Sequence, residues 1–144
     1  MAKKYRRFAY LFNTPARLCE AMAVKYELGY KTRAAYEAGD KDALRTLAEN
    51  DYPAAEKLIK AFALAFEKQW YNDNKPCGFD VQDRRLGGII YRTAACRKRI
   101  IDYVNGRIDR IEELDEELLP YGTKNKPMNL NRFNIYWSTN VVSH

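Results

Sequence analysis

Two long segments with helical periodicity, joined by a short turn, constrain this chain more than any other feature. From Pro53 onward, apolar residues recur every three or four positions, and a second such pattern runs over residues 81–104. This spacing places the apolar side chains on one face of each helix. The first stripe comprises Ala55, Leu58, Ile59, Phe62, Ala65, Phe66 and Trp70, and the second comprises Leu86, Ile90, Ala94, Arg97, Ile101 and Val104. We therefore expect two long helices packed against each other, the second roughly 35 Å long.

Turn and capping residues predict shorter helices before this pair. Thr14-Pro15 is typical of an N-cap followed by proline at the first helical position, so we expect a break there and a separate turn over residues 8–12. Gly29 is a candidate left-handed C-cap for the helix that follows.

The next segments are also punctuated by capping residues. Residues 31–38 indicate a short helix ending at a glycine, and Asp40 can cap another that runs to about residue 49. Asn50 or Asp51 can then cap the first long helix.

The end of the second long helix has clear stop signals. Asn105-Gly106 is expected to be its C-cap, and Asp109 with Glu112 three residues later is expected to form a capping box for a short helix. The tail is rich in asparagine, and alternation over residues 132–138 suggests a lone strand without a partner.

These patterns predict an all-α fold, a small bundle of about five to six helices with two long packed helices and an irregular C-terminal tail. The chain has 144 residues, of which 47% are hydrophobic, so one domain with its own core is expected. We expect residues 1–120 to form the helical domain and residues 121–144 to form the extended tail. No apolar stretch is long enough for a membrane span, no signal peptide is recognised, and a cytoplasmic location is expected.

The residues that usually perform catalysis are scarce. The only histidine is the terminal His144, and the three cysteines are widely spaced, so we expect no catalytic triad, no metal site and no cofactor. Gly87-Gly88 lacks the neighbours of a phosphate-binding loop and is interpreted as a site of close helix approach. Asp115-Glu116 is interpreted as part of a solvated face, because adjacent helical residues point about 100° apart.

The net charge of +6 permits binding to nucleic acid. Basic residues gather in the second long helix, namely Arg84, Arg85, Arg92, Arg97, Lys98 and Arg99. They spread around the helix and are interrupted by Asp83 and Asp102, so ion pairs on a solvated face are the favoured interpretation.

The tract from Trp70 to Gly88 joins the two long helices and combines an aromatic pair, a polar loop and a charged helix entrance. Polar loops held by rigid helices often make functional contacts. The alternative is that its polar residues only cap the second helix.

This tract and several other positions resemble a known family. The residues that carry the resemblance are Asn74, Lys75, Pro76, Gly78, Phe79, Asp83, Arg85, Leu86, Gly87, Gly88, Arg92, Arg99, Tyr103, Asn105, Gly106, Ile111, Glu112, Glu113 and Leu114, preceded by Lys25, Leu28, Gly29, Arg33, Tyr36, Asp40 and Lys41. Together they are similar to the C-terminal helical domain of a group of bacterial family 20 glycoside hydrolases, the β-N-acetylhexosaminidases.

The resemblance implies that the chain is a fragment of such an enzyme and is inactive by itself. The family's adjacent Asp-Glu pair lies on a (β/α)8 barrel and works with the substrate's own acetamido group. A barrel needs about 200 residues or more, so it is absent here and no catalytic residue is carried over.

The resemblance also implies partners: the catalytic barrel, a second copy in a homodimer, and N-acetylhexosamine-containing glycans through the parent enzyme. Candidate contacts with the barrel or a neighbouring subunit are Trp70, Tyr71, Asn74, Lys75, Asp83, Arg85 and Trp137. The competing hypothesis is a stand-alone basic helical module that binds nucleic acid, which we do not favour as a partner.

Overall fold

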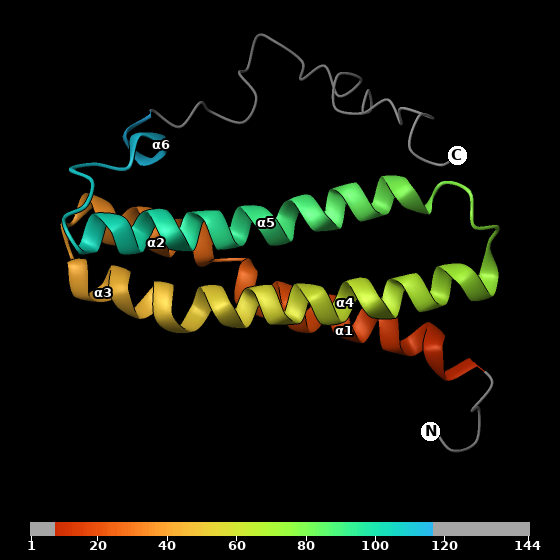
Figure 1. Ribbon diagram of the computed structural model, residues 1–144. Coiled ribbons are helices and arrows are strands. Elements are labelled where there is room, and N and C mark those ends of the chain that lie inside the picture. The colour runs from red at the N-terminus through yellow and green to blue at the C-terminus, as the bar shows by residue number, and fades with distance from the viewer. Residues whose placement is uncertain (1–7, 117–144) are drawn as a thin grey trace, which may run out of the picture.

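The two long helices form the centre of the fold. The computed structural model describes residues 8–116, and within this range the regular elements are all helical. Helix α4 spans Tyr52–Asp73 and helix α5 spans Phe79–Val104, and they pack side by side in opposite directions (Figure 1). The turn between them ends at Gly78, whose φ of +95° is a conformation that glycine adopts without a steric penalty. The predicted all-α fold with two long packed helices is confirmed for these residues.

Helix α1, Ala9–Lys25, lies along α4 and runs through Pro15 without interruption. The predicted break at Thr14-Pro15 is therefore wrong. Thr14 is buried against α4, where its hydroxyl donates to the Ala65 carbonyl at 3.3 Å, and this packing fixes the helix across the proline. Pro15 is exposed, so water can reach the carbonyl that loses its helical partner.

Helix α2, Leu28–Glu37, follows α1 almost directly, and the predicted helix end at Gly29 is wrong. Gly29 lies in the first turn of α2 because the preceding residue, Leu28, is only 6% exposed and anchors that turn in the core. The helix ends before Gly39, which has a φ of +66°, as predicted for a glycine stop.

The segment before α4 is one continuous helical rod. Asp40 caps α3, Lys41–Thr46, by accepting the Ala43 N–H at 2.9 Å, as predicted. The predicted cap at Asn50 or Asp51 is wrong, because a π-helical turn, η2 (Leu47–Asp51), joins α3 to α4. The Tyr52 N–H donates to the carbonyl five residues earlier, so no side-chain cap is needed.

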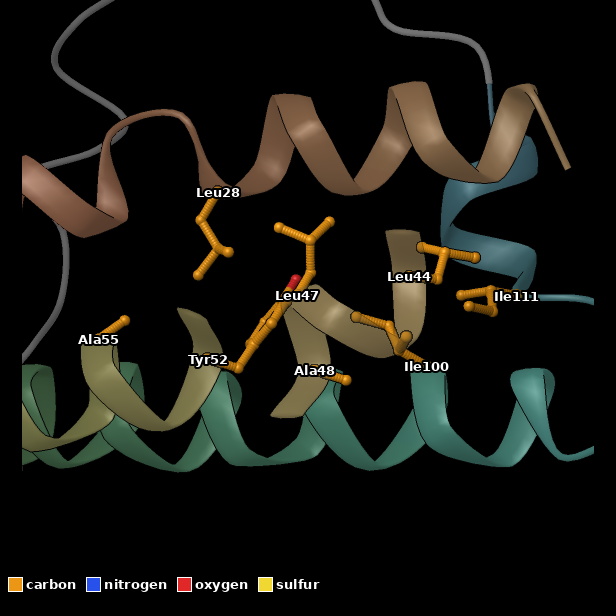
Figure 2. Close-up of a cluster of buried hydrophobic side chains, with 8 residues drawn as sticks. All are labelled: Leu28, Leu44, Leu47, Ala48, Tyr52, Ala55, Ile100 and Ile111. Atoms are coloured by element: carbon orange, nitrogen blue, oxygen red, sulfur yellow. The ribbon is translucent and has the colours of Figure 1, made fainter. Parts of the chain in front are cut away.

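The core lies where this rod, α2 and α5 meet (Figure 2). Its buried members are Leu28, Leu44, Leu47, Ala48, Tyr52, Ala55, Ile100 and Ile111. Leu44 and Ile100 are the largest fully buried side chains among the described residues. The residues of the predicted α5 stripe are half-buried, and the Arg97 Nε donates to the Ala48 carbonyl at 2.9 Å, so this arginine contributes a polar contact to the helix packing.

The end of α5 is as predicted, but the following helix is shorter. Gly106 has a φ of +70° directly after the Asn105 C-cap. Helix α6 spans only Glu112–Asp115, and the predicted capping box at Asp109 is wrong because no side chain caps this helix. Ile111, at its N-cap position, is 4% exposed, so burial in the core positions α6 instead.

Two side chains of α2 hold α6 in place. The Tyr36 hydroxyl accepts the Ile111 N–H at 3.2 Å and donates to the Asp115 carboxylate at 2.9 Å. Arg33 donates to the Leu114 carbonyl at 2.8 Å. Asp115 therefore serves a structural contact at this end of the bundle. The predicted lone strand over residues 132–138 lies outside the described residues.

Candidate functional site

An aromatic cluster closes the α4–α5 end of the bundle. Phe79 is 3% exposed, and its ring centroid lies 5.6 Å from that of Trp70 and 5.5 Å from that of Tyr71. The Trp70 indole also donates to the Lys75 carbonyl at 2.9 Å, which fixes the loop. Trp70 therefore has a structural role in joining the two helices, whereas Tyr71 remains 52% exposed.

The remaining candidate contacts do not converge on one site. Asn74 is the C-cap of α4, where its backbone N–H donates to the Trp70 carbonyl, and Lys75 is exposed in the loop. Asp83 and Arg85 are both exposed on α5, two positions apart, and so lie on different faces of the helix. Trp137 lies outside the described residues. Of these candidate residues, Arg85 alone lines the cavity described next.

That cavity is an open groove of about 730 Å³ between α5 and the junction of α1 with α2. We call it the basic groove, and its lining residues are Lys25, Leu28, Gly29, Tyr52, Val81, Arg84, Arg85, Gly88, Ile89, Arg92, Thr93 and Cys96. Several of these, Lys25, Leu28, Gly29, Arg85, Gly88 and Arg92, are among the residues on which the family resemblance rests.

One face of α5 supplies most of the groove. Its lining positions run from Val81 to Cys96 at steps of one or three residues, which is the pattern of a single helical face. Arg84, Arg85 and Arg92 share this face, so the expectation that the basic residues spread around α5 does not hold for these three.

The interpretation of Gly87-Gly88 as a close helix approach is also wrong among the described residues. A Cβ built at either position would have no heavy atom within 4 Å, apart from the backbone of its own helix. Gly88 instead opens the wall of the groove, and Gly29 on the facing side is equally open.

The electrostatics of the groove are one-sided. Its lining contains four basic side chains and no carboxylate. Arg92 is paired with Glu113 at 3.7 Å, at an exposed position where solvent screens the interaction. Within residues 8–116, Lys25 and Arg85 make no ion pair. The groove therefore presents an excess of positive charge to any occupant.

Two other basic residues of α5, Lys98 and Arg99, form ion pairs within the domain, as predicted for the basic residues of this helix. Lys98 lies 3.7 Å from Asp102, and Arg99 pairs with Glu112 and Glu113. A hydrogen bond from the backbone N–H of Glu112 itself, together with the Arg99 guanidinium, holds the pKa of the Glu112 carboxyl below its ordinary value.

Tyr52 forms part of the groove floor and connects it to the core. Its hydroxyl is 3.1 Å from the Thr32 hydroxyl, which itself donates to the Leu28 carbonyl at 2.7 Å. Burial raises the pKa of Tyr52 above its ordinary value, because the apolar surroundings disfavour the phenolate. The floor is thus neutral and rigid, and the charge lies on the exposed walls.

The groove was not predicted from the sequence, because the apolar spacing of α5 indicated a single packing face. A second face was visible in the spacing of Val81, Arg85, Ile89 and Arg92, which recur at steps of four and three. The contribution of Lys25 had no such signal, because the α1–α2 junction meets α5 only in the folded chain.

Helix α1 carries a separate exposed apolar surface. Its members, here called the α1 stripe, are Leu11, Leu18 and Met22, which are 39%, 41% and 43% exposed and lie seven and four residues apart. Phe12, at 73%, is more exposed still. Because large exposed apolar patches on folded domains often serve as interaction faces, the α1 stripe is a candidate for one.

Neither a metal site nor a membrane-spanning helix is found among the described residues. Residues 8–116 contain no group of three or more histidine, cysteine or carboxylate side chains arranged to hold a metal ion. In the same range, no helix has the length and apolar character required to cross a bilayer.

Comparison with known families gives a single clear result. No curated protein matches the chain. A family model described as the Glycoside Hydrolase 20C C-terminal domain matches residues 1–133, which includes all the helices, the basic groove and the α1 stripe. The chain, as the sequence resemblance predicts, belongs to the family of C-terminal domains of glycoside hydrolase 20C enzymes.

Proposed function

We propose that this chain is the non-catalytic C-terminal domain of a bacterial β-N-acetylhexosaminidase, where it buttresses the catalytic barrel and contributes to a homodimer. The single observation that carries this proposal is the family match over residues 1–133. Through the parent enzyme, the domain serves the hydrolysis of terminal N-acetylhexosamine residues from glycans. The chemistry belongs to the barrel, and this domain contributes stability and assembly.

The exposed apolar surface of α1 supports a role in assembly. One flank of this helix packs on α4, whereas Leu18 and Met22 remain more than a third exposed. Burying such side chains against another domain would contribute roughly 25 cal/mol for each Å² removed from water. Because two interfaces are proposed, one with the barrel and one with a second copy, the test must separate them.

The test combines this chain with a family 20 catalytic barrel supplied as a separate polypeptide. We expect no hydrolysis of a chromogenic N-acetylglucosaminide by the chain alone, and a higher melting temperature of the barrel when the chain is added. The double variant Leu18→Glu/Met22→Glu should lose one of the two associations. The control Leu64→Glu alters a leucine on α4 that is more exposed, at 66%, and should lose neither association.

Light scattering and the barrel's melting temperature then identify the association that α1 serves. Turnover by the repurified chain alone would contradict a non-catalytic role. If the barrel's melting temperature is unchanged and the chain stays monomeric, the proposed buttressing and dimerisation are contradicted.

The exposed loop residues are a narrower part of the proposal. Tyr71 and Asn74 are exposed beside the aromatic cluster, and we propose that they contact the barrel or a neighbouring subunit. Alanine at either position should alter the kinetics of the assembled enzyme while the helical content of the domain stays unchanged. Unchanged kinetics would leave these residues with only a helix-ending role.

The competing function, nucleic-acid binding, rests on the four basic side chains of the groove. It requires an affinity that falls steeply as salt rises. Gel-shift experiments with short DNA and RNA at low salt would decide it, because absence of binding there would eliminate this hypothesis.

A further inference from the structure

The basic groove has the form of a seat for a chain segment. It extends along α5 from Val81 to Cys96, a distance of about 24 Å at the rise of an α-helix. Most side chains on its walls are exposed, and Ile89 is 40% exposed. A small-molecule pocket encloses most of its ligand, whereas this groove is open along its length.

Two glycines in the middle of α5 have no function within the described residues. Glycine in a helix interior is less favourable than alanine by about 0.8–1.0 kcal/mol. Neither Gly87 nor Gly88 has a neighbour within 4 Å of a built Cβ that would explain the absence of a side chain. Gly88 lies in the wall of the groove, so its missing side chain allows the backbone of an occupant to approach α5 closely.

The lining also specifies the chemistry of the occupant. The lining includes the apolar side chains of Leu28, Val81 and Ile89 as well as the basic side chains of Lys25 and Arg85. An occupant that matches both kinds of side chain must have apolar residues flanked by carboxylates. A nucleic-acid backbone would pair with the basic side chains but would not cover the apolar ones.

Helix α6 shows such an occupant at the adjoining part of α5. It carries Glu113 toward Arg92, a groove residue, while the neighbouring Ile111 is buried in the core. An acidic helix with an apolar side therefore already packs against the arginine-bearing surface of α5 within this domain. The groove offers the same combination of contacts from Arg92 back toward Val81.

We propose that the basic groove binds an amphipathic helix of the catalytic barrel domain whose apolar stripe is flanked by carboxylates. The outer layer of a (β/α)8 barrel consists of helices, so it can present such an element. This inference rests on the proposed function and assigns the face of the domain that meets the barrel. Carboxylates of the helix pair with Lys25 and Arg85, and its backbone passes over Gly88.

The experiment measures the affinity between this chain and a separately supplied family 20 barrel by titration calorimetry. Gly88→Leu fills the groove, whereas Gly87→Leu places the same side chain one position away, outside the lining. Both replace a helical glycine with a better helix former, so both variants should fold. Gly88→Leu should weaken binding roughly tenfold or more, as overfilling a packed contact does, and Gly87→Leu should leave it unchanged.

Charge reversal gives an independent readout. Arg85→Glu should weaken binding about tenfold and reduce its salt dependence, whereas Lys68→Glu, an exposed residue of α4 outside the groove, should do neither. Equal effects of the two leucine variants, or of the two charge reversals, would overturn the proposed groove while leaving the proposed function intact. If the unaltered chain does not bind the barrel at all, the proposed function fails first.

Two further results would assign the groove to another occupant and overturn the proposal. In light scattering of the chain alone, conversion of a dimer to a monomer by Gly88→Leu but not by Gly87→Leu would identify a second copy. Loss of binding to a fluorescein-labelled DNA duplex by Gly88→Leu, with its affinity for the barrel unchanged, would identify nucleic acid as the occupant. If neither is seen and only barrel affinity falls, the proposal is supported.

Discussion

Replacing Gly87 or Gly88 with alanine should stabilise this domain. Both residues lie inside α5, Phe79–Val104, far from its ends, and neither has a positive φ. A Cβ at either position meets no heavy atom within 4 Å beyond its own helix. The new methyl group therefore creates no clash, and alanine brings its higher helix propensity.

The magnitude follows from the difference in propensity. Alanine exceeds glycine by about 0.8–1.0 kcal/mol in a helix interior, chiefly because it restricts the unfolded chain more. The two side chains point about 100° apart and share no neighbour, so the double variant should gain about 2 kcal/mol. For a domain of this size, that corresponds to a rise in melting temperature of roughly 4–8 °C.

The assay is urea unfolding followed by circular dichroism, with the slope of the transition compared between variants. Gly39→Ala and Gly106→Ala are the controls, because their φ values of +66° and +70° are strained for alanine. These controls should lose about 1 kcal/mol or more. A loss of stability at Gly87 or Gly88 would refute the reasoning, since it would require a contact that the added methyl group disrupts.

Three further predictions concern packing, the α6 contact and pH. Leu44→Ala, at a position with 0% exposure, should lower the free energy of unfolding by about 2–5 kcal/mol in a denaturant titration, and a loss below about 1 kcal/mol would contradict a tightly packed site. Arg33→Ala should cost about 1–2 kcal/mol and speed amide exchange at residues 111–116, whereas Arg17→Ala, which removes an exposed ion pair, should change neither. Burial raises the pKa of Tyr52 in the folded state. The contribution of its neutral hydroxyl to stability is therefore complete below the ordinary pKa of 10.0 and is lost as the pH rises through the folded-state pKa. Tyr52→Phe should therefore flatten the alkaline decline of stability, and parallel declines would contradict this.

The long helices were predictable because periodicity and local stop signals agree. The stripe from Ala55 to Trp70 and the stop at Asn105-Gly106 lead to the same helix pair that the structure contains. The cap at Asp40 was predictable for a similar reason, because its carboxylate bonds to a backbone N–H only three residues away. Local chemistry determines these features almost completely.

Two of the wrong predictions concern residues where tertiary packing overrides a local helix-start or helix-stop signal. Thr14 has the chemistry of a cap, but its hydroxyl bonds to a carbonyl of α4, and the helix continues. Gly29 could end a helix, but the burial of Leu28 starts a new one at that point. Asn50 and its neighbours lie in a π-helical turn for which the sequence has no separate signature.

The candidate site was harder to predict than the fold because its two walls come from distant parts of the chain. Arg85 was singled out as a possible contact and lines the groove, whereas Lys25, which lines it from the end of α1, was not. Trp70 was singled out for the same role, and it packs in the aromatic cluster between α4 and α5. Aromatic and charged residues in one tract therefore serve different purposes once the helices are formed.

The basic residues of α5 are neutralised unevenly along the helix. In the second half of the helix, Lys98 and Arg99 are neutralised by carboxylates of the same domain. In the first half, Arg85 has no such partner within residues 8–116 and lies beside Gly88 on the open groove. A helix that neutralises its cations at one end and displays Arg85 near the exposed apolar side chain of Ile89 at the other is suited to one acidic, partly apolar partner.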